Sequence, residues 1–161
     1  MSKATTVYKR PDWDQYFLQI AEVVGLRGSC DRGRCGAVIT KDNRIVMTGY
    51  VGAPPGQPHC DEVGHDMQER KHSDGTSSRH CVRTAHSEEN AIIHAAKFGV
   101  VLQGTKIYTK MFPCINCARM IVTAGIGEVM AQNAYQSSAK SKELFGKVGI
   151  KYTTINEETK Y

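Results

Sequence analysis

No stretch of this sequence approaches the roughly 18 consecutive apolar residues that a membrane-spanning helix requires. Residues 1–12 are polar and basic, and they lack the apolar run of a secretory signal peptide. Aromatic residues make up only 7% of the chain, and Lys and Arg never form a run of five, whereas polynucleotide-binding grooves are typically basic and aromatic. We therefore expect a cytoplasmic protein with no membrane partner and no nucleic-acid partner.

Cysteine, in contrast, is plentiful, since the chain has six, and a cytoplasmic environment keeps them reduced. Metal binding or catalysis therefore explains them better than disulfides do. The formal net charge of +5 suits small anionic partners such as nucleotides, and a solvated surface with a slight basic bias explains it equally well. The length of 161 residues, with 40% hydrophobic and 23% charged residues, is typical of one compact globular domain.

The spacing of apolar residues predicts an alternation of helices and strands. Trp13, Phe17 and Val24 follow helical spacing and predict a first helix over residues 11–26. Further helices are expected over 85–98, 114–124 and 137–148, and strands over 35–40, 44–51, 106–110, 128–132 and 150–155. The first two strands should form a hairpin around the polar residues 41–43. Alternating strands and helices imply a layered α/β fold with parallel strands.

Residues 52–84 interrupt this alternation. The segment holds three prolines, four histidines and two cysteines, and it has no core pattern. About thirty such residues are too many for a simple loop in a compact domain. We expect a short helix near residues 61–71, and something other than a hydrophobic core to order the segment.

Two short motifs carry the chemistry: H-x-E at residues 86–88 and P-C-x-x-C at residues 113–117. Cys114 and Cys117 are three residues apart, so on a helix they share one face. Near the start of that helix the positive end of the helix dipole favours thiolates, which are zinc ligands. An imidazole from His86 would be the third ligand, and the fourth position would remain for water, as in a catalytic zinc site.

Glu88 follows His86 by two residues, and in a regular helix their side chains diverge by roughly 200°. Both can address one point only if it lies beyond the N-terminus of the helix, so we expect the metal between two helix starts. Two thiolates cancel the charge of the zinc ion, which then acidifies its water less, and a nearby base such as Glu88 becomes useful. H-x-E with P-C-x-x-C is the signature of zinc-dependent deaminases. A closed structural zinc site and ordinary core cysteines are the alternatives.

From about residue 11 to residue 155 the chain resembles the deoxycytidylate (dCMP) deaminase family of the cytidine deaminase superfamily, in the form found in bacteria and their phages. The zinc motif marks only the superfamily, whereas Thr48-Gly49-Tyr50 and the Cys/His-rich insert are similar to the dCMP branch. Further matching segments are 24–30, 38–39, 59–61, 80–84, 88–92, 112–117 and 124–126.

The resemblance implies one deaminase domain over residues 1–161, with a three-layer α/β/α cytidine-deaminase-like fold and a five-stranded mixed sheet. It implies hydrolysis of dCMP to dUMP and ammonia, which feeds thymidylate synthesis. A zinc-activated water would attack carbon 4 of the pyrimidine, and Glu88 would pass the proton to ring nitrogen 3 and then to the departing amine. A deaminase that uses dCTP, also or instead, is the alternative.

The same resemblance implies a substrate pocket with Ser87 and Phe112 beside the base, Arg27 on the 5′-phosphate, and Tyr135 lining the wall. An arginine fork suits phosphate oxygens, although a solvated Arg27 and a Tyr135 that only packs are the alternatives. Lys110 stands where threonine is common, and it could reach a further phosphate or only solvent.

Regulation is also implied by the resemblance. Family members are often hexamers that dCTP activates and dTTP inhibits, with magnesium accompanying the effector nucleotide. The effector would lie near Gly49, Tyr50 and Gly52. This sequence departs from the pattern there, because Val51 stands where asparagine is usual.

The remaining cysteines and histidines suggest a second, structural zinc that would order the insert. The best ligand set is Cys30, Cys60, His65 and Cys81, with His59 or His80 as substitutes. Cys35 opens an apolar strand and is expected to pack as a small hydrophobe, and His94 is expected to be a core histidine.

Two other functions compete with this interpretation. One is a deaminase that acts on a polynucleotide or another heterocycle, and the scarcity of aromatics and basic runs argues against it. The other is a non-enzymatic zinc module that binds nucleic acid, and this would leave Glu88 without a role.

Overall fold

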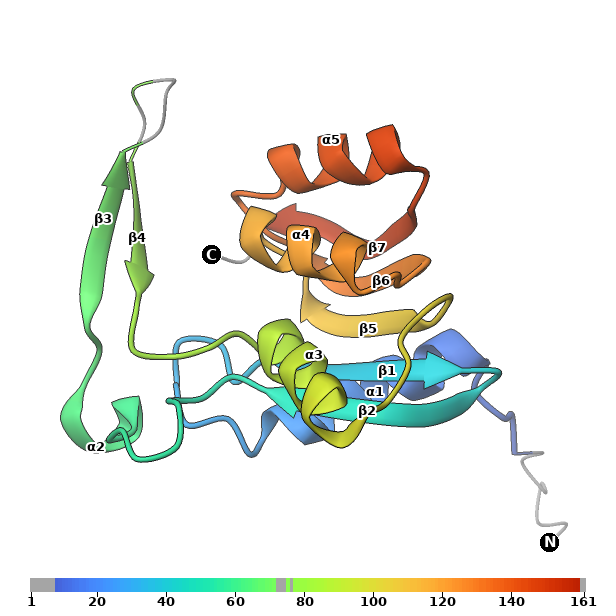
Figure 1. The fold of residues 1–161 in the computed structure, drawn as a ribbon, viewed down its shortest axis with the longest axis horizontal. Helices are drawn as coiled ribbons and strands as arrows, with labels where there is room; N and C mark the ends of the chain where they lie inside the picture. Colours follow the sequence, from blue (N-terminus) through green and yellow to red (C-terminus); the bar gives the residue numbers. More distant parts are fainter. Residues whose placement is uncertain (1–7, 72–74, 76, 160–161) are drawn as a thin grey trace, which may run out of the picture.

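The protein is described by a computed structural model that covers residues 8–71, 75 and 77–159, and a five-stranded mixed sheet runs through its centre (Figure 1). The strands are β1 (Gly36–Lys41), β2 (Arg44–Tyr50), β5 (Lys106–Met111), β6 (Glu128–Ala134) and β7 (Lys151–Thr159). Their order is β2-β1-β5-β6-β7. Strand β1 is antiparallel to β2 and β5, whereas β6 is parallel to both β5 and β7.

The expectation of parallel strands therefore holds only for the second half of the sheet. Strands β1 and β2 are antiparallel because a tight hairpin joins them, and two residues are too few to connect parallel strands. The turn residues Asp42 and Asn43 have φ angles of 49° and 57°. Left-handed backbone at both positions is what a two-residue type I′ hairpin requires.

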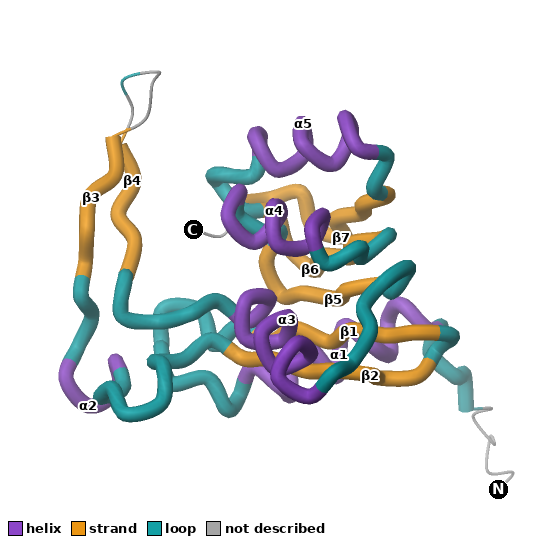
Figure 2. The backbone as a smooth tube through the Cα atoms, viewed as in Figure 1, coloured by secondary structure: helices purple, strands orange, loops and turns teal. Residues whose placement is uncertain are grey.

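Helices cover both faces of the sheet, as Figure 2 shows. Helix α1 (Trp13–Gly25) lies on one face, and helices α3 (Ser87–Phe98), α4 (Ile115–Thr123) and α5 (Ala139–Val148) lie on the other. The predicted first helix, which the side chain of Asp12 caps through the amide of Gln15, is thus confirmed within a few residues. In the described part of the chain, no helix combines the length and apolarity needed to cross a membrane.

The hydrophobic core has two layers because side chains alternate along the buried strands. In β1, Val38 faces α1, where it packs with Phe17. Its neighbour Ile39 faces the opposite way and joins Ile107 and Phe145 under α3, α4 and α5. Strand β1 is therefore buried on both faces, which fits its continuous apolar sequence.

The insert stands apart from the sheet (Figure 1). It contains a short helix, α2 (Cys60–Val63), and a separate two-stranded sheet of β3 (Met67–Lys71) and β4 (Ser77–Cys81). The helix expected near residues 61–71 is wrong beyond residue 63. Gly64, with a φ of 79°, ends the helix, and residues 67–71 pair with β4 instead.

Gly49 lets the backbone of β2 approach that of α3 closely. A Cβ atom there would clash with the carbonyl oxygen of Ser87 and the amide nitrogen of Ala91, both of which are backbone atoms. Backbone atoms cannot turn aside as a side chain can, so only glycine fits. This contact fixes where the first turn of α3 lies relative to the sheet.

We expect Gly49→Ala to lower the free energy of unfolding by about 1–3 kcal/mol, because the added methyl group forces the backbones apart. Gly146→Ala is the matched control, since a Cβ there meets no atom within 4 Å and alanine favours the helix. Denaturant unfolding measures both. Similar midpoints for the two variants would contradict the close-packing role of Gly49.

Candidate active site

The residues of the two motifs meet where two helices begin. His86 is the N-cap of α3, Cys114 is the N-cap of α4, and Cys117 lies in the first turn of α4. The carboxylate of Glu89 accepts a hydrogen bond of 2.7 Å from the backbone amide of His86, which fixes the start of α3. The site thus lies between two helix N-termini, as the spacing of the motifs predicts.

The three donor atoms lie at distances that suit a tetrahedral zinc ion. His86 Nδ1 lies 3.6 Å from Cys114 Sγ and 3.4 Å from Cys117 Sγ, and the two sulfurs are 3.6 Å apart. Tetrahedral zinc, with Zn–S near 2.3 Å and Zn–N near 2.0–2.1 Å, places such atoms about 3.6–3.8 Å apart. The triad therefore supplies three corners of a tetrahedron and leaves the fourth open.

The protonation of the triad also suits a divalent cation. The side-chain hydrogen bond between Cys114 and Cys117 lowers the pKa of Cys114 to about 3, and the hydrogen bond between His86 and Cys114 raises the pKa of His86 to about 9. The same sulfur pair raises the pKa of the Cys117 thiol. A cation that binds here would displace the protons that these groups still carry.

Glu88 lies beside this triad and is buried, since only 6% of the residue is exposed. Burial raises its pKa, while the charge of His86 opposes the shift. The hydroxyl of Ser87 donates a hydrogen bond of 2.8 Å to Glu88 Oε2. The carboxylate is therefore held in one orientation and is suited to accept and return a proton.

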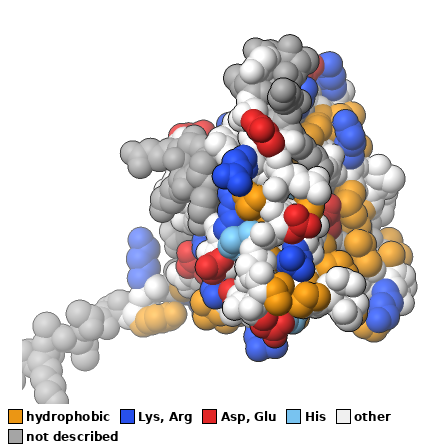
Figure 3. All heavy atoms as spheres, turned by 90° about the vertical axis from the view of Figure 1, so that its left-hand side faces the viewer, with side chains coloured by type: hydrophobic (Ala, Val, Ile, Leu, Met, Phe, Trp, Pro, Cys, Tyr) orange, Lys and Arg blue, Asp and Glu red, His pale blue; other side chains and the backbone are white. Residues whose placement is uncertain are grey.

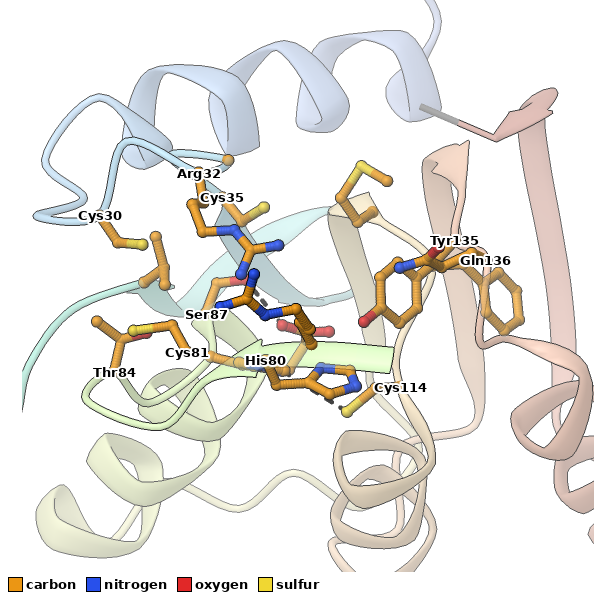
Figure 4. A pocket seen from close by; sticks show the side chains of 17 residues that line it. Cys30, Arg32, Cys35, His80, Cys81, Thr84, Ser87, Cys114, Tyr135 and Gln136 are labelled. Atoms are coloured by element: carbon orange, nitrogen blue, oxygen red, sulfur yellow. Dashed lines mark hydrogen bonds between the residues drawn. The ribbon is translucent and has the colours of Figure 1, made fainter. Parts of the chain in front are cut away.

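A pocket opens over the triad, and Figure 4 shows the side chains around it. His86, Ser87, Glu88 and Cys114 line its floor. Phe112 and Tyr135 also line it, so the structure brings together three of the four residues expected to bind the substrate. Phe112 is 1% exposed and contacts the rings of Phe145 and Tyr152, so it also anchors the wall to the core.

The fourth expected residue, Arg27, lies elsewhere. It is exposed just beyond the end of α1 and does not line the pocket. Two other arginines, Arg32 and Arg79, line the pocket instead. Sequence reasoning missed both. The sequence did hold one signal for them, because Arg32 and Arg79 each lie two residues from a cysteine of the second cluster, Cys30 or Cys81.

The second cluster brings together three of the four residues expected to hold a structural zinc, and the fourth, Cys81, adjoins it through Cys60. The donor atoms of Cys30, Cys60 and His65 lie within 4.8 Å of one another. His65 Nδ1 lies 3.8 Å from Cys30 Sγ, and Cys81 Sγ lies 3.7 Å from Cys60 Sγ. Three cysteines and one histidine form a donor set typical of a closed structural zinc site.

The surroundings of this cluster support the same interpretation. His65 Nε2 lies 2.9 Å from the carboxylate of Asp31, and such a carboxylate commonly orients a zinc-bound histidine. Burial raises the pKa of Cys60 to about 12. Burial also acts on Cys81, but hydrogen bonds from the Arg83 backbone and from His65 lower its pKa to about 7.

The suggested substitute ligands stand outside the cluster. His59 is the N-cap of α2, and its amide donates to the Glu62 carboxylate at 3.0 Å. His80 lines the pocket and lies 2.7 Å from Ser78 Oγ. Cys35 is partly buried against Cys30, as expected of a small hydrophobe, but it also lines the pocket. His94 is exposed on α3 beside Phe98, so the expectation of a core histidine is wrong.

The residues expected near an effector nucleotide lie next to the start of α3. Gly49 is buried against that helix, and Gly52 forms an isolated bridge with Ala85. Tyr50 is 40% exposed, and its carbonyl accepts a hydrogen bond from Asn90 at 2.7 Å. Whether a nucleotide binds there stays a prediction.

Comparison with known proteins shows what the chain is similar to. Residues 11–133 match the model of the cytidine and deoxycytidylate deaminase zinc-binding region. ComE operon protein 2 of Bacillus subtilis is 37% identical over 88% of this chain and 70% of its own length. The deoxycytidylate deaminase of Mycobacterium phage D29 is 35% identical over 75% of this chain and 94% of its own length.

Solved structures agree on the fold. The dCMP deaminase of the cyanophage S-TIM5, crystallised with dCMP and dUMP, matches 91% of this chain and 99% of its own with a TM-score of 0.72 at 23% identity. Not every relative has this length, since the chain spans only 43% and 44% of the two yeast deoxycytidylate deaminases that it also matches.

We expect the purified protein to contain near two zinc ions per chain, and Cys60→Ser to contain near one, because the substitution removes a donor from the second cluster only. Elemental analysis by mass spectrometry measures this ratio. Cys35→Ser is the control, since Cys35 belongs to neither donor set. A wild-type value near one that Cys60→Ser leaves unchanged would rule out the second ion.

Proposed function

This chain belongs to the cytidine and deoxycytidylate deaminase zinc-binding family, and on that basis we propose that it hydrolyses dCMP to dUMP and ammonia. The observation that carries the proposal is the meeting of His86, Cys114 and Cys117, of which His86 and Cys114 line a pocket, with buried Glu88 beside them. Three donors and an open fourth corner distinguish a catalytic zinc site from a closed structural one. The named activity of the phage D29 relative supports the substrate.

His86, Cys114 and Cys117 would hold the zinc ion, which supplies an acidified water at the open corner. Glu88 takes the proton of that water, and its buried carboxylate is already held by Ser87 Oγ. Glu88 then delivers that proton to ring nitrogen 3 of the cytosine while the water oxygen bonds to carbon 4. Glu88 next moves the remaining proton from this oxygen to the amine, whose bond to carbon 4 breaks, so that ammonia leaves and the oxygen stays as the carbonyl of dUMP. One water is consumed and one ammonia is released, so Glu88 ends in the protonation state in which it began.

The walls of the pocket orient the base. Phe112 directly follows β5 and Tyr135 directly follows β6, and both line the pocket. Aromatic side chains of this kind pack against a pyrimidine ring. The Tyr135 hydroxyl also offers a polar group to the nucleotide, because a phenol can donate and accept hydrogen bonds.

A polynucleotide substrate is the weaker candidate. On the face that carries the hairpin of β3 and β4, Lys and Arg side chains are interspersed with Asp and Glu, as Figure 3 shows. This face does not offer the continuous basic track on which single strands typically bind. The arrangement suits a small nucleotide better than a polymer.

Several further properties remain part of the proposal. We propose a second, structural zinc on Cys30, Cys60, His65 and Cys81, a cytoplasmic location, and a role in thymidylate supply. Assembly into a hexamer, activation by dCTP, and inhibition by dTTP with magnesium are predictions from family resemblance. Use of dCTP as a substrate is the alternative that the assay below separates from dCMP.

The proposal predicts ammonia release from dCMP, with little or none from cytidine. The assay compares dCMP, dCTP, deoxycytidine and cytidine, each with and without dCTP or dTTP as an effector. Fast turnover of dCMP that the triphosphates modulate would establish both the substrate and the regulation. If no free nucleotide is turned over, the proposed reaction is wrong.

Glu88→Gln should lower kcat at least 10²-fold, because general acid–base catalysis typically contributes 10²–10⁴-fold. Zinc content should stay unchanged, since Glu88 is outside the donor set. Glu62→Gln is a control for the loss of one carboxylate, as Glu62 is exposed on α2 and outside the pocket. A Glu88→Gln variant with near-normal kcat would disprove the role of Glu88.

A further inference from the structure

The start of α3 carries both His86 and Glu88, and its own side-chain hydrogen bonds do not fix it against the sheet. The Glu88 carboxylate accepts a hydrogen bond from the Ser87 hydroxyl, and the Glu89 carboxylate accepts one from the amide of His86. All four residues belong to the cap and first turn of one helix, so these bonds move with it. The place of the Glu88 carboxylate in the pocket therefore depends on contacts that this turn makes with other elements.

The end of β2 and the residues just after it supply such contacts on both sides of the turn. Before the turn, the backbones of Gly52 and Ala85 form an isolated bridge with hydrogen bonds of 3.2 and 3.0 Å. After it, the side-chain amide of Asn90 donates a hydrogen bond of 2.7 Å to the carbonyl of Tyr50. These two contacts enclose the first turn of α3.

Gly49 and Asn90 restrict the separation of α3 and β2 in opposite ways. Gly49 allows a close approach, because a Cβ atom there would clash with the backbone oxygen of Ser87. Close approach alone does not stop the helix from moving away or sliding along the strand. A short hydrogen bond restricts both movements, because it weakens steeply with distance and angle. The Gly49 contact involves backbone atoms, whereas Asn90 uses its side chain, so a substitution can remove the Asn90 contact alone.

The carbonyl that Asn90 binds belongs to a peptide group that also holds the wall of the pocket. The amide of Val51, in the same peptide group as the Tyr50 carbonyl, donates a hydrogen bond of 2.9 Å to the carbonyl of Cys35. This peptide is trans, so its N–H and C=O bonds point in opposite directions. One peptide group therefore links α3 on one side to the start of β1 on the other. Val51 and Cys35 both line the pocket.

We propose that Asn90 is a positioning residue that holds the Glu88 carboxylate at a fixed place relative to the pocket wall. This inference rests on the proposed function, in which Glu88 transfers protons. Asn90 does not line the pocket, so it acts through the backbone of the turn and not by touching the substrate. Its hydrogen bond to Tyr50 is exposed, so the loss of this bond costs the fold little while it releases the carboxylate from its place.

The test removes the donor without adding a charge. Asn90→Leu has a side chain of similar size and no hydrogen-bond donor, and leucine favours a helix. We expect it to lower kcat for dCMP by roughly tenfold, because catalysis falls steeply when a catalytic group leaves its productive geometry. KM and the zinc content should stay unchanged. Asn90→Gln keeps the amide donor and should recover most of the lost kcat.

A double-mutant cycle shows whether Asn90 acts through Glu88. If it does, Asn90→Leu should lower kcat no further in a Glu88→Gln background, because the carboxylate to be positioned is already gone. An equal loss in both backgrounds would overturn the proposal, since Asn90 would then act independently of Glu88.

Lys147→Met is the matched control for the loss of an exposed side-chain hydrogen bond. Lys147 donates to the Glu143 carboxylate at 2.6 Å on α5, and neither residue lines the pocket. This variant should keep the wild-type kcat. A loss as large as that of Asn90→Leu would mean that kcat responds to any weakening of the surface, which contradicts a specific role for Asn90.

Hydrogen exchange measures the positioning without any reaction. In the first turn of α3 the amide of Asn90 donates to the carbonyl of His86 at 3.0 Å, and just beyond the other end the amide of Val100 donates to the carbonyl of Ala95 at 2.9 Å. Asn90→Leu should speed exchange in the first turn and leave the far end unchanged, because only the first turn loses its tie to β2. Unchanged exchange at both ends would overturn the proposal even if kcat falls.

Failure of this proposal and failure of the proposed function are distinguishable. If the wild-type chain deaminates no free nucleotide, the proposed reaction is wrong, and hydrogen exchange still decides whether Asn90 holds the turn. If deamination occurs and Asn90→Leu keeps the wild-type kcat, the reaction stands and the positioning role does not.

Discussion

The convergence of two helix N-termini at one end of the sheet is the constraint on which the rest of the structure depends. Three donor atoms must lie within about 4 Å of one another to share a metal ion, and they come from two helices that are separated by a complete strand. Gly49 allows the backbone of α3 to pack closely against β2, which positions His86. Strand β5 ends shortly before Pro113 and the start of α4, which positions Cys114. The same convergence aligns the positive ends of two helix dipoles on the site, which favours the thiolate of Cys114.

Local patterns predicted this part of the molecule because its signals are local. The H-x-E and P-C-x-x-C spacings, together with the requirement that His86 and Glu88 address one point, indicated a site off two helix starts, and the structure has it there. The mixed sheet followed from the family resemblance rather than from the alternation of elements. That alternation alone suggested parallel strands, whereas the hairpin predicted around residues 41–43 is confirmed and makes β1 and β2 antiparallel.

The insert was harder, because contacts distant in sequence determine its shape. Residues 67–71 have no strong strand pattern in the sequence. They pair with residues 77–81 after Gly64, with its positive φ, ends the short helix before them. The four members of that cluster could be named from their types alone, since cysteines without another role are few. The sequence alone could not show that Arg32 and Arg79, rather than Arg27, line the pocket. That depends on the path of the loop through Gly33 and Arg34, which only the structure shows.

The hairpin of β3 and β4 is a sheet of its own, and it differs from the five-stranded sheet in how many buried apolar side chains hold it. The sheet rests on two layers of buried side chains, whereas the hairpin is tied to the body through the small cluster around Cys30, Val51 and Cys60. Segments with few buried contacts open at a lower free-energy cost than the core does. The zinc triad at the two helix starts can therefore keep its geometry while the hairpin opens, and the pocket would first lose the wall that His80 and Cys81 form.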